Sequence, residues 1–345
     1  MKLLTIIIPS FNSEKWIQGC LESLLVGLDD KLEVIVINDG SKDRTSEIAH
    51  AFCEKHPFAR VIDKENGGHG SGINVGLKNA TGLYFKVLDS DDHLDSDGLH
   101  ELIDIIEKHQ AEGNLPDVYL ADYISVLNGG DNRRKINTVK KYFKKHIQEV
   151  VSFDKIKRFS PDFYIMMHAV FTKTELLKET HMELLEHTFY EDNQYVYHVL
   201  IHANTYCHLD KPIYLYTVGL SEQSISPQNM SKNYKHQLRV MDAMFKEVSY
   251  DELKAMHKMH QEMVFHELFI ESCLSYFYIY IDSTKEKNKE YKDMYRAFKL
   301  ADKKLYKRLR WRTLVSFMHS IPPFFRKTAC RIGYNTIGKK KGWKF

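Results

Sequence analysis

Short apolar runs alternate with amphipathic segments through the first quarter of the chain. Four runs rich in β-branched or aromatic residues have the character of buried strands, at residues 3–8, 33–37, 59–63 and 83–88. Between them, apolar residues recur at helical spacing, which predicts helices at 13–25, 43–55 and 73–79. Apolar strands that alternate with helices form a parallel sheet covered on both faces. The pattern therefore predicts an α/β fold with a mostly parallel, Rossmann-like central sheet.

A polar loop follows each of the four predicted strands. Ligands of parallel sheets bind beyond the carboxyl ends of the strands, so these loops should meet at one edge. Their residues are Pro9, Ser10, Phe11 and Asn12; Asn38, Asp39, Gly40 and Ser41; Asn66 to Gly72; and Asp89, Ser90, Asp91 and Asp92. This arrangement predicts a ligand site at that edge.

The last of these loops is a dense acidic cluster. Asp89, Asp91 and Asp92 crowd three carboxylates into four residues, and they repel one another unless a cation or solvent neutralises them. Oxygen ligands beside a small serine suit Mg²⁺ or Mn²⁺ bridging to a phosphate. The alternative is an acidic turn that caps the next helix, a position that Asp and Ser favour.

The third loop is rich in glycine. Gly67, Gly68, Gly70 and Gly72 permit positive φ and a close backbone approach, so their N–H groups could receive a phosphate or a sugar hydroxyl. The loop is not a Walker motif, because no Gly-Lys-Ser/Thr follows it. We interpret His69, within the loop, as structural rather than catalytic.

These loops, taken in order, resemble the family 2 glycosyltransferases, which have a GT-A fold and transfer sugars from nucleotide donors with inversion. The resemblance covers about residues 1–226 and extends to Tyr190-Glu191-Asp192, which looks like the acidic pair of the family, and to two later segments, Pro212 to Tyr216 and Ser224 to Ser226. The family often has Ala-Arg-Asn after the glycine loop, where Gly72, Ile73 and Asn74 stand here. The role of that arginine must fall to another cation or be absent.

The resemblance implies a donor site, a metal site and a choice of nucleotide. Asp91 is expected to bind Mn²⁺ or Mg²⁺ directly, and Asp89 to contact the ribose, the metal or its water. A carboxylate only accepts hydrogen bonds, so Asp39 fits the N3–H of uracil or thymine, or the N1–H and amino group of guanine. Among these donors, a UDP-sugar is favoured. The alternative is that Asp39 belongs to a simple βα turn. The residues expected to bind the donor are Pro9, Ser10, Phe11, Asn12, Asp39, Asn66, Gly67, Gly68, Asp89 and Ser90.

Glu191 and Asp192 cannot both point into one site from a helix. Asp192 shares a stripe with Val196 and Val199, which predicts a buried face, whereas Glu191 lies on the face of His198 and is expected to be wetter. By resemblance, Asp192 is the general base that takes the proton of the acceptor hydroxyl in a direct displacement.

The last third of the chain is helical in pattern. Long amphipathic segments predict helices at 229–247, 250–282 and 284–308. We therefore expect a GT-A domain at 1–226, a helical region at 227–302 and a basic amphipathic tail at 303–345.

Charge is unevenly divided. Of 49 Lys and Arg in the chain, 13 lie in residues 303–345 without any acid, which leaves 36 against 46 Asp and Glu in the rest. Basic clusters beside aromatic residues such as Trp311 and Phe324 favour an anionic membrane surface. The alternatives are a tail that docks on the acidic body and contact with nucleic acid, which we do not expect.

Other features bear on the compartment. Five widely spaced cysteines form no disulfide or metal pattern, no signal peptide precedes the first strand, and no run of 18 uncharged apolar residues occurs. We expect a cytoplasmic protein, peripheral at the inner face of the cell membrane.

The sequence thus predicts a metal-dependent inverting glycosyltransferase that moves a sugar from a nucleotide donor to a glycan or lipid-linked acceptor. One alternative is a sugar nucleotidyltransferase, which should carry an Arg-containing glycine loop after the first strand, where Pro9 to Asn12 stand. The other is a non-catalytic scaffold of the same fold.

Overall fold

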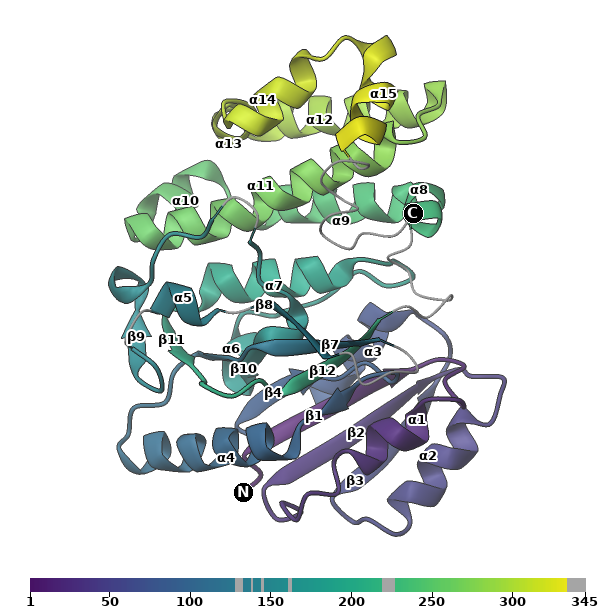
Figure 1. Cartoon of the computed structure of the whole chain (residues 1–345), viewed down its shortest axis with the longest axis vertical. Coiled ribbons are helices and arrows are strands. Elements are labelled where there is room, and N and C mark those ends of the chain that lie inside the picture. The colour runs from purple at the N-terminus through teal and green to yellow at the C-terminus, as the bar shows by residue number, and fades with distance from the viewer. Residues whose placement is uncertain (128–132, 138, 144–145, 161–162, 219–226, 334–345) are drawn as a thin grey trace. The chain divides into compact units, whose positions relative to one another are not determined.

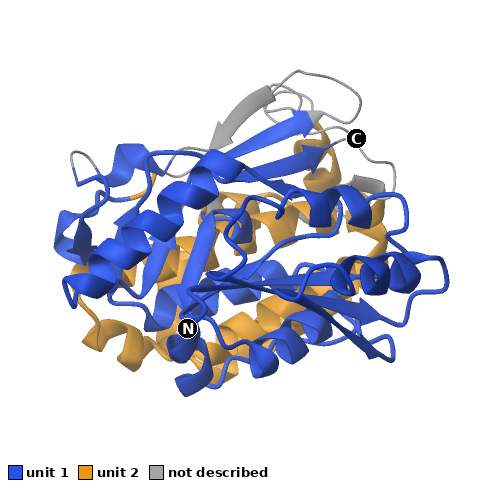
Figure 2. Ribbon diagram, turned by 90° about the horizontal axis from the view of Figure 1, so that it is seen from below, with its two compact units in different colours: residues 1–158, 165–220 blue, residues 159–164, 221–345 orange. Residues whose placement is uncertain are grey.

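The computed structural model describes residues 1–127, 133–137, 139–143, 146–160, 163–218 and 227–333. The chain divides into two compact units (Figure 2). Unit 1 comprises residues 1–158 and 165–220, and unit 2 comprises residues 159–164 and 221–345. Unit 2 thus contains the predicted helical region and the described part of the predicted tail.

A large mixed sheet forms the centre of unit 1, with the strand order β3-β2-β1-β4-β10-β6-β11-β9 (Figure 1). The strands are β1 (Leu4–Ser10), β2 (Leu32–Asp39), β3 (Ala59–Lys64), β4 (Tyr84–Val87), β6 (Val118–Leu120), β9 (Val150–Ser152), β10 (Val170–Lys173) and β11 (Thr205–His208). The first four strands run parallel to one another, and β10 pairs antiparallel with both β4 and β6. The predicted α/β fold with a mostly parallel sheet is confirmed.

A second, smaller sheet stands beyond the carboxyl end of β4. It has the order β5-β12-β7-β8, with β5 (His93–Leu94), β7 (Tyr123–Leu127), β8 (Arg133–Asn137) and β12 (Tyr214–Val218). Because β5 directly follows the acidic cluster, this sheet anchors the cluster to β12, which lies far away in the sequence.

Helices cover the large sheet. They are α1 (Ile17–Glu22), α2 (Thr45–Cys53), α3 (His69–Asn79), α4 (Ser96–Ala111), α5 (Lys140–Phe143), α6 (Thr174–Glu179) and α7 (Glu191–His202), with short 3₁₀ turns at η1 (Phe153–Lys155) and η2 (Met167–Ala169). Figure 1 shows α1 and α2 on the β2–β3 side of the sheet. The three predicted helices of this region are present, but their bounds differ from the predicted ones.

The start of α3 shows why. This helix begins at His69, four residues before the predicted start, and so includes two glycines of the predicted loop. A Cβ on Gly72 would lie 3.0 Å from Cβ of Pro9, and one on Gly76 would lie 2.7 Å from Cγ2 of Ile7. Only glycine tolerates so close an approach, so α3 packs directly on β1 and carries its first turn to the edge of the sheet.

Unit 2 is helical in its described residues. Its helices are α8 (Pro227–Lys232), α9 (Tyr234–Glu247), α10 (Tyr250–Ala255), α11 (Lys258–Tyr280), α12 (Lys285–Ala301), α13 (Lys303–Arg310), α14 (Thr313–Ser320) and α15 (Pro323–Gly333). The predicted helix 284–308 breaks at Asp302, whose carboxylate accepts the backbone N–H of Leu305 over 2.7 Å and caps α13. Among the described residues, no helix has the length and apolar character needed to span a membrane.

Candidate active site at the carboxyl edge of the sheet

The predicted loops meet at the carboxyl edge of β1, β2 and β4. Asn12 has a positive φ of 50°, and its side-chain oxygen accepts the N–H of Lys42 in the loop after β2. The hydroxyl of Ser13 lies 2.7 Å from that of Ser90, in the acidic cluster. Pro9 and Ser10 are buried in β1, whereas the ring of Phe11 is half exposed. The structure therefore places these segments at one edge.

Asp39, the last residue of β2, is buried and fully engaged. One carboxylate oxygen accepts from Lys64 Nζ at 2.6 Å and from the N–H of Gly67 at 2.8 Å. The other accepts from the N–H of Gly68 at 2.8 Å and from Nδ2 of Asn66 at 3.0 Å. The N–H groups of Gly67 and Gly68 thus donate to Asp39 and do not face an open site for a phosphate or a sugar hydroxyl. If Asp39 receives a nucleotide base, one of these donors, such as Lys64 or Asn66, must yield its place.

A hollow of about 520 Å³ opens beside Asp39. Its lining comes from the ends of β1, β2 and β3, and consists of Phe11, Gly40, Lys42, Asp63, Lys64, Glu65 and Asn66. Its size lies in the range of small-molecule sites. Phe11 offers an aromatic ring there, and the positive charges of Lys42 and Lys64 stand beside the carboxylates of Asp63 and Glu65.

Within the acidic cluster, Asp92 faces inward. Its carboxylate accepts the hydroxyl of Tyr214 and the N–H of Thr217, each at 2.6 Å. Burial raises the pKa of Asp92 well above its ordinary value, and the charges of Asp89 and Asp91 add to the rise. Asp92 therefore serves to fasten the cluster to β12. Asp91 is half-buried and stays the predicted metal ligand.

Asp89 and Glu191 are joined through the ring of His69, the first residue of α3. Nε2 of His69 lies 3.0 Å from Oδ1 of Asp89, and Nδ1 lies 2.6 Å from Oε1 of Glu191. Burial lowers the pKa of His69, but the hydrogen bonds to the two carboxylates outweigh it and raise that pKa well above its usual value. Burial likewise raises the pKa of Asp89, but His69 outweighs this effect and lowers that pKa to about 2.

The fold adds a residue that sequence reasoning missed. His168, in η2, brings a ring nitrogen into a group with carboxylate oxygens of Asp89 and Asp92, all within 4.8 Å of one another. Its ring stacks on Tyr214 and leans on Tyr216, with centroids 4.5 and 4.4 Å apart. Burial lowers the pKa of His168 to about 4, so the ring is neutral, and its Nδ1 has no hydrogen-bond partner among the described residues. A lone histidine in an apolar stretch carries no sequence signal for such a role.

The predicted contrast between Glu191 and Asp192 is wrong. Glu191 is buried, with 2% of its surface exposed, whereas Asp192 is half-buried. The helix pattern failed here because nine side chains of α7 are buried, on more than one face of the helix. Burial and then the neighbouring charge of Glu191 raise the pKa of Asp192 to about 7, a value suited to a general base.

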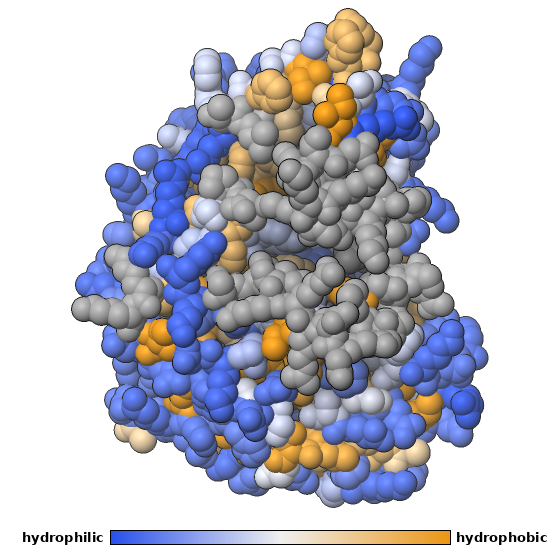
Figure 3. Space-filling view, viewed as in Figure 1, coloured by the Kyte–Doolittle hydropathy of each residue, from blue (hydrophilic) through white to orange (hydrophobic). Residues whose placement is uncertain are grey.

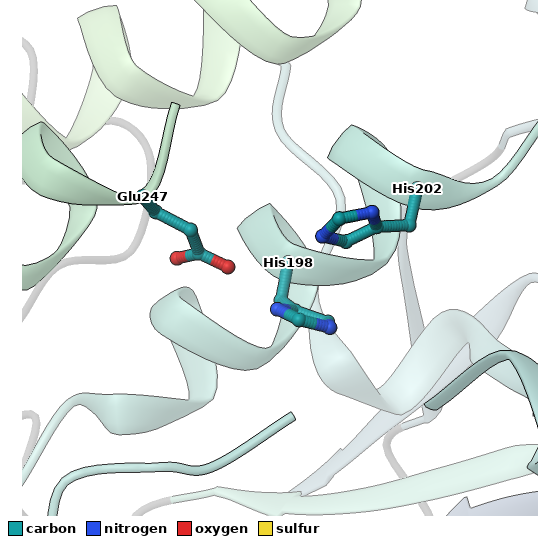
Figure 4. Close-up of side chains that lie close together, drawn as sticks. All are labelled: His198, His202 and Glu247. Atoms are coloured by element: carbon teal, nitrogen blue, oxygen red, sulfur yellow. The ribbon is translucent and has the colours of Figure 1, made fainter. Parts of the chain in front are cut away.

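Two histidines lie further along α7. His198 and His202 are one turn apart, and their ring centroids are 4.5 Å apart (Figure 4). Nε2 of His198 lies 2.8 Å from the hydroxyl oxygen of Thr180. His198 is therefore buried and hydrogen-bonded within unit 1, contrary to the wetter face predicted for it.

The chain is similar in sequence to known proteins. A family model described as glycosyl transferase family 2 matches residues 5–173. EpsJ of Bacillus subtilis, an uncharacterised glycosyltransferase, is 37% identical over 110 residues, which are 32% of this chain and 32% of that protein. Chondroitin synthase of Pasteurella multocida is 39% identical over 97 residues, 28% of this chain and 10% of that protein. The chain thus spans about a third or less of the length of these curated relatives.

A solved structure extends the likeness in fold. TarS residues 1–349 of S. aureus, in complex with UDP-GlcNAc, match with a TM-score of 0.69 at 22% identity, over 97% of this chain and 92% of that chain. This similarity supports the predicted GT-A fold with a helical region after it. Through residues 5–173, the chain belongs to glycosyl transferase family 2.

Proposed function

We propose that this protein is a metal-dependent inverting glycosyltransferase that moves a sugar from a nucleoside diphosphate, preferably UDP, to a hydroxyl group of a glycan or lipid-linked acceptor. The observation that carries the proposal is the meeting of Asp39, the acidic cluster and Asp192 at one edge of a sheet, in a chain of this family. Asp39 would bind the nucleobase, the acidic cluster would hold the metal beside the diphosphate, and Asp192 would accept the proton.

The donor end of the site is supported by the hollow beside Asp39. An aromatic ring lines it, together with two lysines and two acidic residues, and the ring suits a planar base. TarS was solved with UDP-GlcNAc and also with UDP, and it is similar in fold. Together these observations favour a UDP-sugar, and Asp39 would accept the imide N–H of the base once Lys64 or Asn66 moves.

The residues present fit a divalent cation. Carboxylate oxygens and one neutral imidazole are ligands that Mn²⁺ accepts, and His168 presents a buried ring nitrogen without a protein partner among the described residues. Asp89, Asp91 and His168 would hold the metal. Asp92 would keep the cluster in place through its hydrogen bonds to Tyr214 and Thr217. When bound, the cation would neutralise the diphosphate as the glycosidic bond breaks.

The proton chemistry is assigned to Asp192. At pH values above about 7 its carboxylate is ionised and can take the proton of an acceptor hydroxyl as the oxygen attacks the anomeric carbon. One carboxylate is sufficient, because a diphosphate leaves without a general acid. A single displacement of this kind inverts the anomeric configuration.

We also propose that unit 2 binds an anionic membrane surface, which would place the enzyme at the cytoplasmic face of the cell membrane. Figure 3 shows hydrophobic residues gathered over α14 and α15. Trp311, Phe317 and Phe324 expose 79, 63 and 75% of their surface. Part of the basic charge has partners within unit 2, since Arg308 and Arg312 both pair with Glu262. The tail can therefore dock in part on the rest of unit 2 while its exposed aromatic residues bind a membrane.

Thermal-shift screening tests the function directly. The full chain is melted with UDP-, dTDP-, GDP- and CMP-sugars, each with and without Mn²⁺, and donors that bind are then assayed for release of nucleoside diphosphate. We expect a UDP-sugar to raise the melting temperature most, and only with Mn²⁺. Release of inorganic diphosphate from a sugar phosphate and a nucleoside triphosphate would favour the nucleotidyltransferase, and absence of any binding would favour the scaffold.

A further inference from the structure

His69 occupies a position between the two halves of the site. Its ring nitrogens lie 3.0 Å from Asp89, on the donor side, and 2.6 Å from Glu191, next to the proposed base. Asp89 follows β4 and Glu191 opens α7, so the ring joins segments that are about a hundred residues apart in the chain. We call this pair of contacts the His69 bridge.

Glycine makes the bridge possible. A Cβ on Gly70 would lie 2.4 Å from the carbonyl oxygen of Leu185 and 3.0 Å from Cγ of Glu191. Gly68 has a φ of 87°, and a Cβ there would lie 3.1 Å from the nitrogen of His187. The first turn of α3 therefore lies against the segment that leads into α7, and no larger residue allows the same approach.

Further hydrogen bonds hold that segment along α3. The carbonyl oxygen of Gly67 accepts the N–H of His187 over 2.6 Å. The side chain of Asn74 both donates to the carbonyl of Leu184, at 2.9 Å, and accepts its N–H, at 2.8 Å. His69 extends this row of hydrogen bonds from the segment to α7.

Glu191 depends on this contact. Its side chain is 3% exposed, and its second oxygen, Oε2, has no hydrogen-bond partner among the described residues. A buried carboxylate without a compensating partner is costly, so loss of His69 would drive Glu191 to move. Tyr190, just before it, has a left-handed backbone with φ at 72°, a conformation that persists only where neighbours hold it.

We propose that His69 is a positioning residue that couples the donor-side cluster to the start of α7, and so sets the place of Asp192. This inference rests on the proposed glycosyltransferase function. Through Asp89 the ring contacts the loop that would hold the donor, and through Glu191 it orients the turn that carries the base. The acceptor hydroxyl, which Asp192 deprotonates, and the anomeric carbon of the donor would then be held at a reactive distance.

The test is a double-variant cycle in the full chain, with His69→Leu, Glu191→Leu and the pair together. We expect each single change to lower kcat about 10- to 100-fold, as a misplacement of about 1 Å can do, with the donor KM changed less than about threefold. The pair should lose no more activity than the worse single variant, because either change alone already breaks the contact between His69 and Glu191. His69→Gln, which keeps one N–H donor, should recover part of the loss.

A matched control separates positioning from general stability. His109→Leu removes another buried histidine of unit 1, whose Nδ1 lies 2.8 Å from the hydroxyl oxygen of Tyr119. It should lower the melting temperature and leave kcat unchanged in the folded protein.

Three results would overturn the inference. They are wild-type kcat in folded His69→Leu, additive losses in the pair, and a rise in donor KM at unchanged kcat, which would place the ring in donor binding alone. A wild-type protein that neither binds nor turns over any nucleotide sugar would overturn the proposed function and this inference with it. Turnover by the wild type beside unaffected variants would overturn the inference only.

Discussion

The hydroxyl of Tyr214 donates to Oδ2 of Asp92 over 2.6 Å and accepts the backbone N–H of Asp89 over 3.1 Å. One side chain from the first position of β12 thus organises the loop after β4. The acidic cluster owes its shape to this contact, because Asp92 is withdrawn from solvent while Asp91 stays half-buried. The relationship makes Tyr214 the structural support of the proposed metal site.

Replacing Tyr214 by Phe should destabilise unit 1. The variant removes the donor to a buried carboxyl group and leaves that group short of a partner, which costs about 1–3 kcal/mol. Urea denaturation measures the change in the free energy of unfolding. Tyr206→Phe is the matched control, since among the described residues its hydroxyl makes a long hydrogen bond of 3.4 Å to the carbonyl oxygen of Ala203. Equal losses in the two variants would contradict the assigned role of Tyr214.

Asp192→Asn should abolish turnover and spare donor binding. Removal of a general base lowers kcat by about 10²- to 10⁴-fold, and the amide occupies the same space as the carboxylate. Steady-state kinetics give kcat, and calorimetry with the donor and Mn²⁺ gives its Kd, which we expect to change less than about threefold. In the wild type, kcat/KM should rise as pH increases through about 7, where Asp192 ionises. A variant with wild-type turnover would remove Asp192 from the mechanism.

The same carboxylate should make stability depend on pH. Its pKa is raised to about 7 in the folded protein, from an ordinary value near 3.8, so the folded state holds this proton more tightly than the unfolded state. The wild type should therefore lose stability relative to Asp192→Asn as pH rises from about 4 to about 7, and the difference should then level off. Melting temperatures of both proteins at pH 5 and pH 8 check the sign. A larger advantage for the variant at pH 5 would refute it.

Manganese binding should require both Asp91 and His168. We expect Asp91→Asn and His168→Phe each to weaken Mn²⁺ affinity at least about tenfold, because each removes one proposed ligand. Phenylalanine retains the ring that packs beside Tyr214. Electron paramagnetic resonance of free Mn²⁺ provides the titration, and His109→Phe is the control for loss of a buried histidine. Unchanged affinity in His168→Phe would restrict the site to carboxylates.

Membrane binding should depend on the exposed aromatic residues of unit 2. Truncation after Asp302 removes α13 to α15, and should release the protein from vesicles that contain phosphatidylglycerol. A milder variant changes Trp311, Phe324 and Phe325 to Ser, residues that expose 79, 75 and 55% of their surface. Leu300→Ser, on α12 and 81% exposed, is the matched control. Undiminished co-sedimentation of the triple variant would argue against this surface.

Much of unit 1 could be predicted because its signals are local. Apolar strands such as β1 and β2, and the polar residues that directly follow them, are visible as runs in the sequence. Helix bounds were harder, since the start of α3 depends on how closely Gly72 approaches Pro9. The exposure of Glu191 and Asp192 was predicted wrongly, because α7 is buried on more than one side and has no single solvent-exposed face.

The sequence alone was sufficient for the fold class, for the family, and for the edge at which Asp39, Asp89 and Asp192 would stand. Strand periodicity and the rule for parallel sheets place Asp39 and Asp89 without any knowledge of packing, whereas Asp192 was assigned by the family resemblance. Tertiary structure alone decided which groups touch. It set the four donors around Asp39, the approach of His168 to the acidic cluster, and the His69 bridge. These contacts join residues from 25 to more than a hundred positions apart, so they follow from how helices and strands pack, which no local pattern encodes.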